Sequence, residues 1–193
     1  MSAPPTGELR RVRVVGVSGA GKSTIGAALA ERLGVPLLAL DEVFHGPGWV
    51  GRTDDEARAR VDAFLAGPGR DGWVVDGNWN SRVGDWFDAA DATVWVDPPR
   101  RVSTARVVRR TLWRALTRAE LWNGNRERPS NLLSLDPERN VVLWSWRSYD
   151  EYQQRYGALV AAGTMPVVRL RTARAARAWL ATLAPGSGPS SPA

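Results

Sequence analysis

The sequence contains no cysteine, and His45 is its only histidine. Without cysteine, the chain forms neither disulfide bonds nor thiolate metal sites. A single histidine excludes a zinc centre with several histidine ligands and leaves little basis for a catalytic triad built around an imidazole. Disulfide-stabilised scaffolds, cysteine-ligated metal proteins and multi-histidine zinc enzymes are therefore excluded.

Long apolar segments are also missing. No run approaches the ~20 apolar residues that span a bilayer, and residues 1–7 lack the apolar core of a signal peptide. We therefore expect a cytoplasmic protein without a membrane partner. With 193 residues, of which 44% are hydrophobic and 24% charged, the chain has the composition of one globular domain. Residues 9–184 are expected to form it, between a flexible N-terminus (1–8) and a disordered tail (185–193).

Lysine is as scarce as histidine. Of the 26 lysine and arginine residues, only Lys22 is a lysine. In a chain with so strong a preference for arginine, this lysine indicates a role for a compact ammonium that fits inside a tight loop. The formal net charge of +6 favours an anionic ligand, either a nucleotide or a nucleic acid, without choosing between them.

Lys22 belongs to a glycine-rich stretch, residues 16–24, that reads G-V-S-G-A-G-K-S-T. A run of β-branched residues precedes it, and a helix-like run, residues 25–33, follows. Strand, glycine loop and helix together form the context that a phosphate-binding loop requires. The glycines let the backbone curl so that its N–H groups face one anion, and the positive end of the following helix adds to this attraction.

This loop predicts the binding of a nucleoside triphosphate, ATP or another, together with Mg²⁺. Lys22 is expected to reach the β- and γ-phosphates, and Ser23 to place its hydroxyl on Mg²⁺. The alternative is a glycine-rich turn between a strand and a helix that binds no ligand. The residues expected to bind the nucleotide are Gly16, Ser18, Gly19, Ala20, Gly21, Lys22, Ser23 and Thr24.

Short apolar runs alternate with helical patterns along the rest of the chain, which predicts a parallel sheet covered on both faces. In such sheets, ligands bind along the carboxyl edge of the strands. The expected strands are residues 12–17, 35–40, 73–75, 92–96 and 166–170. The expected helices after the first are residues 54–65, 101–117, 138–162 and 173–183.

Acidic residues follow three of these strands. Asp76 has the position of a Walker-B-type carboxylate that holds Mg²⁺, and its alternative role is that of an Asp-Gly turn. Asp41 is expected to face the acceptor, where it could take a proton from a hydroxyl or order a metal-bound water; its alternative is a helix cap or a surface ion pair. Asp97 precedes two prolines and is expected to shape a turn, and His45 is expected to be structural.

The helix expected at 101–117 carries arginines four residues apart, which form one basic stripe. Such a stripe is often a solvated face, but phosphoryl transfer needs guanidinium groups around the moving phosphate. Arg106 and Arg110, nearest the expected site, are candidate catalytic residues. The full stripe comprises Arg106, Arg110, Arg114 and Arg118, and the apolar face expected against the core comprises Val102, Ala105, Val108, Leu112 and Leu116.

Two further features concern the acceptor side. Arg82, six residues after Asp76, is a candidate clamp on the acceptor. The polar segment at 121–128 has the character of a lid tip, which would exclude water from a reactive phosphate; the alternative is an ordinary surface loop. The lid is expected at about residues 111–139.

Three stretches together carry a resemblance to a known family: residues 16–24, 40–49 (L-D-E-V-F-H-G-P-G-W) and 73–79 (W-V-V-D-G-N-W). The W-S-W sequence at 144–146 also fits. On these residues the chain resembles the adenylate-kinase-like P-loop kinases, and within them the small proteins known as topology modulation proteins. The resemblance spans about residues 10–180.

The resemblance implies a three-layer P-loop NTPase fold with a five-stranded parallel sheet in the order 2-3-1-4-5 and a lid after strand four. It also implies a nucleoside triphosphate donor, Mg²⁺, and an acceptor region over strands two and three. Two stretches depart from the family pattern. The loop of adenylate kinases usually reads G-K-G-T, where residues 21–24 read G-K-S-T. Adenylate kinases have D-G-F-P-R where residues 76–82 read D-G-N-W-N-S-R, so the signature for AMP recognition is not intact.

We therefore expect a monomeric phosphotransferase that acts on a small nucleotide-like or hydroxyl acceptor. The expected catalytic residues are Lys22, Asp41, Arg106 and Arg110; Ser23 and Asp76 are expected to manage Mg²⁺, and Asp41 and Arg82 to face the acceptor. The alternative is a nucleotide-binding regulator associated with nucleic acid, with little or no turnover. A third reading makes nucleic-acid ends the phosphoryl acceptor.

Overall fold

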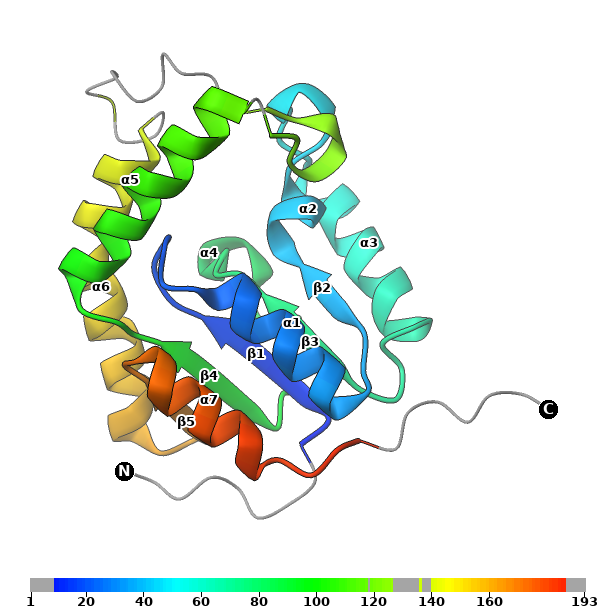
Figure 1. Cartoon of the computed structure of the whole chain (residues 1–193). Coiled ribbons are helices and arrows are strands. Elements are labelled where there is room, and N and C mark those ends of the chain that lie inside the picture. The colour runs from blue at the N-terminus through cyan, green and yellow to red at the C-terminus, as the bar shows by residue number, and fades with distance from the viewer. Residues whose placement is uncertain (1–8, 118, 127–135, 137–139, 187–193) are drawn as a thin grey trace.

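A five-stranded sheet forms the centre of the molecule in the computed structural model, which describes residues 9–117, 119–126, 136 and 140–186 (Figure 1). All strand pairs are parallel, and their order is β2-β3-β1-β4-β5. This confirms the expected sheet. The strands are β1 (Arg11–Val15), β2 (Leu37–Ala39), β3 (Trp73–Asp76), β4 (Ala92–Val96) and β5 (Val167–Leu170).

Helices cover both faces of this sheet, as the alternation of patterns predicted (Figure 1). The longer helices are α1 (Lys22–Leu33), α3 (Asp54–Ala66), α5 (Arg100–Thr117), α6 (Val141–Ala162) and α7 (Ala173–Thr182). The shorter helical turns are α2 (Leu40–Phe44), η1 (Pro47–Trp49), α4 (Asn80–Val83) and η2 (Trp122–Gly124). Within the described part of the chain, no helix is long and apolar enough to cross a membrane.

The apolar core is split by the sheet because alternate side chains of each strand point to opposite faces. On one face, Val12 and Val14 of β1 pack with α1 and α7, and Trp179 of α7 belongs to this cluster. On the other face, Val75 of β3 packs with α2 and α3, and Trp95 of β4 packs with α6. Each fully buried aliphatic side chain contributes about 1.5–3 kcal/mol, so the core fixes the sheet that carries the loops.

Local signals set the limits of the helices that flank the site. Helix α1 ends at Gly34, which is left-handed and donates its N–H to the carbonyls of Ala30 and Glu31. Helix α3 begins at Asp54 as expected, but Thr53 caps it. The Thr53 hydroxyl accepts from the Glu56 N–H, and the Glu56 carboxylate accepts from the Thr53 N–H.

The second strand is shorter than expected, and this changes the setting of Asp41. The apolar run at 35–40 forms a strand only over Leu37–Ala39, after which α2 begins at Leu40. Asp41 therefore lies in the first turn of a short helix rather than in a loop. It still lies beyond the carboxyl end of β2, at the same edge of the sheet as Asp76.

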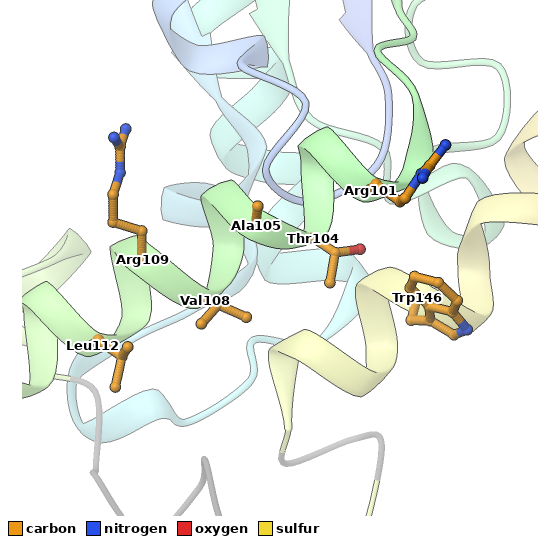
Figure 2. A pocket seen from close by; sticks show the side chains of 7 residues that line it. All are labelled: Arg101, Thr104, Ala105, Val108, Arg109, Leu112 and Trp146. Atoms are coloured by element: carbon orange, nitrogen blue, oxygen red, sulfur yellow. The ribbon is translucent and has the colours of Figure 1, made fainter.

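The expected inner face of α5 is wrong. Its apolar residues face outward: Leu112 is 50% exposed and Leu116 is 85% exposed, whereas Ser103, Val107 and Thr111 are buried. Figure 2 shows Val108 and Leu112 on the side of α5 that borders Trp146 of α6. Val108, Leu112 and Trp146 line an open groove of about 500 Å³ together with four further residues, Arg101, Thr104, Ala105 and Arg109. The spacing of the apolar residues predicted a helix correctly. It did not predict which side of that helix the rest of the protein covers.

The remaining domain expectations fall partly outside the described residues. This applies to the N-terminus (1–8), to all but the first two residues of the tail (185–193), and to residues 127–135 and 137–139 of the expected lid. Arg118, the last residue of the basic stripe, and Arg128 at the end of the lid segment also lie outside them. The lid boundaries at 111–139 stay a prediction.

Candidate active site

The glycine loop at 16–24 has left-handed backbone conformations, which favour glycine, at Gly16, Gly19 and Gly21, and at the first two a side chain would also collide with backbone. Gly16 has φ +145° and Gly19 has φ +77°. A Cβ at Gly16 would lie 2.3 Å from the carbonyl oxygen of Val96, and a Cβ at Gly19 would lie 2.3 Å from that of Ser103. Neither backbone oxygen can move away cheaply, so both glycines are required by space as well as by conformation.

Side chains from α5 and α6 hold this loop in place. Arg106 Nη1 donates to the Ala20 carbonyl at 3.0 Å, and Arg110 Nη2 donates to Ser18 Oγ at 3.1 Å. The hydroxyl of Ser145, in the W-S-W sequence of α6, donates to the Ser18 carbonyl at 2.9 Å. The two expected catalytic arginines therefore lie beside the glycine loop, where both are half-buried.

Lys22 lies among the charges that the sequence predicted around it. Its Nζ donates to the Val17 carbonyl at 3.1 Å. Burial lowers the pKa of the Lys22 ammonium, whereas Asp76 and then Asp41 act to raise it. One cation thus interacts with both predicted carboxylates, and the three residues form a single electrostatic cluster.

Asp76 and Ser23 form the oxygen pair expected to hold Mg²⁺. Asp76 is the last residue of β3, is only 7% exposed, and has a side-chain hydrogen bond with Ser23. Its other oxygen, Oδ1, is buried and has no hydrogen-bond partner among the described residues. Burial raises the pKa of Asp76, and Lys22 and Ser23 oppose that shift. A buried, unpartnered carboxylate oxygen beside a hydroxyl fits a hard cation that prefers oxygen ligands.

On the acceptor side, Asp41 is held by a tryptophan that the sequence did not single out. Trp79 Nε1 donates to Asp41 Oδ1 at 2.8 Å. The Trp79 ring stacks on Phe44 with 4.3 Å between centroids, and it meets the edge of His45 at 5.2 Å. The sequence signals for Trp79 were its place in the stretch 73–79 that carries the family resemblance and in the stretch 76–82 that departs from the adenylate kinase pattern.

The guanidinium of Arg82, the candidate acceptor clamp, is occupied by the protein's own groups. Its Nε pairs with Asp54 Oδ1 at 2.6 Å, and its Nη2 donates to the Arg52 carbonyl at 2.7 Å. The guanidinium also lies over the Phe44 ring, 4.4 Å from its centroid. In this arrangement Arg82 joins α3 to α4, and its role as an acceptor clamp stays a prediction.

Asp97 and His45 have structural surroundings. Asp97 is buried at the end of β4, pairs with Arg169 at 2.6 Å and also accepts from Gln153. It therefore joins β4, β5 and α6 instead of only shaping a turn. Burial lowers the pKa of His45, whose Nδ1 has no hydrogen-bond partner among the described residues. The imidazole is thus held neutral, between the rings of Trp49 and Trp79.

The described part of the predicted lid tip, residues 121–126, lies against the loop that contains Trp49, and η2 contacts η1. In Figure 1 these are the yellow-green and cyan turns that lie side by side at the upper right. Asn125 Nδ2 donates to the Gly46 carbonyl at 2.9 Å, and Asn125 Oδ1 accepts from the Trp49 N–H at 2.8 Å. Asn123 Nδ2 donates to the His45 carbonyl at 2.6 Å, and Trp49 Nε1 donates to the Arg126 carbonyl at 3.0 Å. No motif marked these asparagines, because their partners lie more than 70 residues away in sequence.

Comparison with known proteins identifies the fold. At the level of sequence, no family model and no curated protein matches this chain. Among solved structures, shikimate kinase from Bacteroides thetaiotaomicron is 17% identical, covers 91% of this chain and 96% of its own, and gives a TM-score of 0.51. Shikimate kinase from Acinetobacter baumannii in complex with shikimate is 19% identical, with 90% and 89% covered and a TM-score of 0.50.

A third similar structure is a gluconokinase from Sinorhizobium meliloti 1021, which is 22% identical, with 91% and 93% covered and a TM-score of 0.49. The two shikimate kinases cover 91% and 90% of this chain. The chain therefore has the α/β fold of P-loop kinases, with a five-stranded parallel sheet in the order 2-3-1-4-5.

Proposed function

We propose that this protein is a Mg²⁺-dependent kinase that transfers a phosphoryl group from ATP, or another nucleoside triphosphate, to a small nucleotide-like or hydroxyl acceptor. One observation carries this proposal: Lys22, Asp76 and Asp41 form one cluster beside a glycine loop that Arg106 and Arg110 contact. A loop that bound nucleotide only for structure would need neither the second carboxylate nor the two guanidinium groups.

We further propose that the protein is an adenylate-kinase-like enzyme of the topology modulation type, active in the cytoplasm as a monomer. The stretches at 40–49 and 73–79 support this assignment because they supply Asp41, Asp76 and Trp79 to the cluster. Residues 9–184 form the catalytic domain in this proposal, and the segment at 121–126 is the tip of its lid.

The donor side binds and orients the triphosphate. The loop N–H groups and the Lys22 ammonium neutralise the β- and γ-phosphates, and Arg106 and Arg110 stabilise the charge that spreads over the moving phosphoryl group. Mg²⁺, when bound, would be held by Ser23 and Asp76 and would neutralise charge on the same phosphates.

The acceptor side handles the proton. The acceptor oxygen forms a bond to the γ-phosphorus while the bond from that phosphorus to the β–γ bridging oxygen breaks, which releases the nucleoside diphosphate. For a hydroxyl acceptor, the Asp41 carboxylate takes the proton that the acceptor oxygen loses. Trp79 orients Asp41 through its Nε1–H. The segment at 121–126 closes over the acceptor-side loop and limits water, which would otherwise hydrolyse the triphosphate.

A turnover screen tests this function. ATP consumption with Mg²⁺ is measured against nucleoside monophosphates, nucleosides, sugars and oligonucleotide ends, with the Lys22→Ala variant in parallel. We expect one acceptor class to stimulate ATP consumption and Lys22→Ala to abolish that stimulation while keeping its circular dichroism spectrum. A folded Lys22→Ala protein with full turnover would exclude this site as the catalytic centre.

A second candidate function is a nucleic-acid-associated regulator with little turnover. The observation that favours it is the exposure of three tryptophans, Trp113 of α5 and Trp144 and Trp146 of α6, which are 45–58% exposed in a chain of net charge +6. Exposed aromatic rings stack unpaired bases, and cations bind the phosphate backbone. This function predicts binding of single-stranded oligonucleotides that weakens steeply with salt; no binding at low salt would rule it out.

A further inference from the structure

One side chain outside the predicted site forms two hydrogen bonds with the first residue of the glycine loop. Asn78 Oδ1 accepts from the Gly16 N–H at 3.0 Å, and Asn78 Nδ2 donates to the Gly16 carbonyl at 2.8 Å. The carboxamide therefore satisfies both polar groups of Gly16, although the two residues are 62 positions apart. A side-chain amide is the group that offers one acceptor and one donor in this fixed arrangement.

The course of β3 explains why a side chain makes these bonds. The last backbone bond along this edge runs from the Gly77 N–H to the Val14 carbonyl at 3.2 Å. At Gly77 the chain turns out of the sheet with φ +136°, where a Cβ would lie 2.8 Å from Leu40 Cβ. The backbone of β3 thus cannot reach Gly16, and the Asn78 carboxamide continues the strand pairing by one residue.

Asn78 and Gly16 are themselves fixed from other directions. On the side of β4, the Val96 carbonyl leaves no room for any side chain at Gly16. Tyr152 of α6 forms a hydrogen bond with the Asn78 side chain. Gly16 is consequently held between the end of β4 and a carboxamide whose own position is set by α6, so the start of the loop has little freedom to shift.

The neighbours of Asn78 give this contact its significance. Asp76, two residues earlier, interacts with Lys22 and Ser23. Trp79, the next residue, donates to Asp41 and has a left-handed backbone with φ +36°. A short run of residues 76–79 therefore contacts the expected metal pair, the start of the glycine loop and the acceptor-side carboxylate in succession.

We propose that Asn78 is a positioning residue that fixes the start of the phosphate-binding loop against the run at 76–79. It thereby sets the spacing between the bound phosphates, the Asp76–Ser23 pair and Asp41. The inference rests on the proposed phosphoryl transfer for its effect on rate, but its effect on nucleotide binding is independent of any acceptor. Displacing reacting groups by 1 Å costs on the order of 10²-fold in rate, so such a contact matters for catalysis.

The test compares Asn78→Ala and Asn78→Asp with a matched control, Asn140→Ala. Asn140 is also a buried asparagine whose side chain accepts from backbone N–H groups, those of Val142 and Leu143, where it caps α6. Calorimetry measures the affinity for ATP with Mg²⁺, steady-state assays give kcat and KM, and hydrogen exchange follows the peptide that contains Gly16.

We expect Asn78→Ala to weaken ATP binding about 10-fold and to lower kcat/KM on the order of 10²-fold. Exchange at the loop peptide should accelerate. Asn78→Asp should lose more, because its carboxylate faces the Gly16 carbonyl and the phosphates without a donor. Asn140→Ala should lower the unfolding temperature by a similar amount while keeping wild-type ATP affinity. If Asn78→Ala does not fold, Asn78→Gln, which misplaces the same amide by one methylene, should show the same pattern.

The inference is overturned if Asn78→Ala binds and turns over ATP like the wild type. It is also overturned if Asn140→Ala, at equal loss of unfolding temperature, loses as much ATP affinity and loop protection. Should no acceptor be phosphorylated by the wild type, the kinase proposal fails, and ATP affinity and hydrogen exchange still decide the role of Asn78.

Discussion

The two sides of the candidate site adopt left-handed backbone conformations with different residues. On the donor side, Gly16, Gly19 and Gly21 have φ between +77° and +145°. On the acceptor side such conformations belong to large or polar residues as well as to glycines, among them Gly48, Gly77 and Gly124. Within the described part of the chain, the non-glycine residues with positive φ are Trp49, Trp79 and Asn123. Glycine adopts such angles without steric cost, whereas other residues pay about 1–3 kcal/mol each.

The strained residues of the acceptor side are held by hydrogen bonds from their own side chains. Trp49 donates its Nε1–H to Arg126, Trp79 donates to Asp41, and Asn123 donates to His45. Their partners lie 38 to 78 residues away in the chain. Both sides are held by distant segments, since Asn78, Arg106, Arg110 and Ser145 contact the donor loop from 62 to 127 residues away. The difference is that glycine adopts the donor-loop angles without strain, whereas on the acceptor side these contacts must also offset the strain of Trp49, Trp79 and Asn123. The acceptor side is therefore the side where a substitution changes conformation most easily.

The largest expected effect comes from changing the donor cation while keeping its charge. Lys22→Arg should lower kcat by about 10²-fold or more, because the larger guanidinium does not fit where the compact ammonium donates to the Val17 carbonyl. Steady-state ATP turnover measures this. The control Arg109→Lys makes the opposite exchange at an exposed position of α5 and should keep wild-type turnover. Wild-type rates for Lys22→Arg would mean that only charge matters at this position.

Removing the charge of the buried Asp76 carboxylate should lower activity without lowering stability. Asp76→Asn should lower Mg²⁺-dependent turnover roughly 10²-fold. Because burial raises the pKa of Asp76, the wild-type chain loses stability as the pH rises through that pKa, and the neutral amide lacks this loss. The unfolding temperature of Asp76→Asn at pH 7 should therefore not fall below that of the wild type. Thermal scans that show a clear decrease would indicate a structural role for the charge.

On the acceptor side, a smaller effect should appear mainly in stability and in acceptor binding. Asn125→Ala leaves the Gly46 carbonyl and the Trp49 N–H without their partner, which should cost about 1–3 kcal/mol of unfolding free energy in urea titrations. The KM for the acceptor should rise while ATP affinity stays unchanged. Exposed Gln154→Ala on α6 serves as the control. If Asn125→Ala changed ATP affinity as much as the KM for the acceptor, the donor and acceptor sides would not be independent.

The smallest expected effect concerns the only histidine. Burial lowers the pKa of His45 in the folded state, so the unfolded chain binds a proton first when the pH falls below about 6.5. The stability that this neutral imidazole provides is present above that pH and is lost as the pH falls toward the folded-state pKa. Comparing the unfolding temperatures of the wild type and His45→Gln between pH 5 and 8 isolates the contribution of His45 to stability. If the unfolding temperatures of the two proteins changed equally with pH, this contribution would be absent.

The parts of this molecule that the sequence predicted are those with local causes. The five strands, the order of the long helices and the glycine loop follow from apolar runs, caps and one motif, each contained in about ten to twenty residues. The arginine stripe was also predicted, because a spacing of four residues is a property of the helix itself. Arg106 and Arg110 accordingly lie together beside the loop.

The features that the sequence did not predict depend on which part of the folded protein a segment packs against. The outer face of α5 was expected to be buried, but the Arg106 and Arg110 side of this helix covers the glycine loop, and the apolar side is left outward. The short helices α2 and α4 have too few residues to show a period. Asn78 and Asn125 form their decisive hydrogen bonds with residues more than 60 positions away, and no spacing within one segment encodes such a pairing.

Lys22 carries the only side-chain amine in the sequence, and it lies inside the candidate donor site. A reagent that modifies amines therefore has one side-chain target, besides the terminal α-amine. Protection of Lys22 by a nucleotide can be followed by the mass of the one peptide that contains it, without a reporter group or an engineered label. Because the chain has a single lysine, binding of a nucleotide to the glycine loop can be measured before any reaction product has been identified.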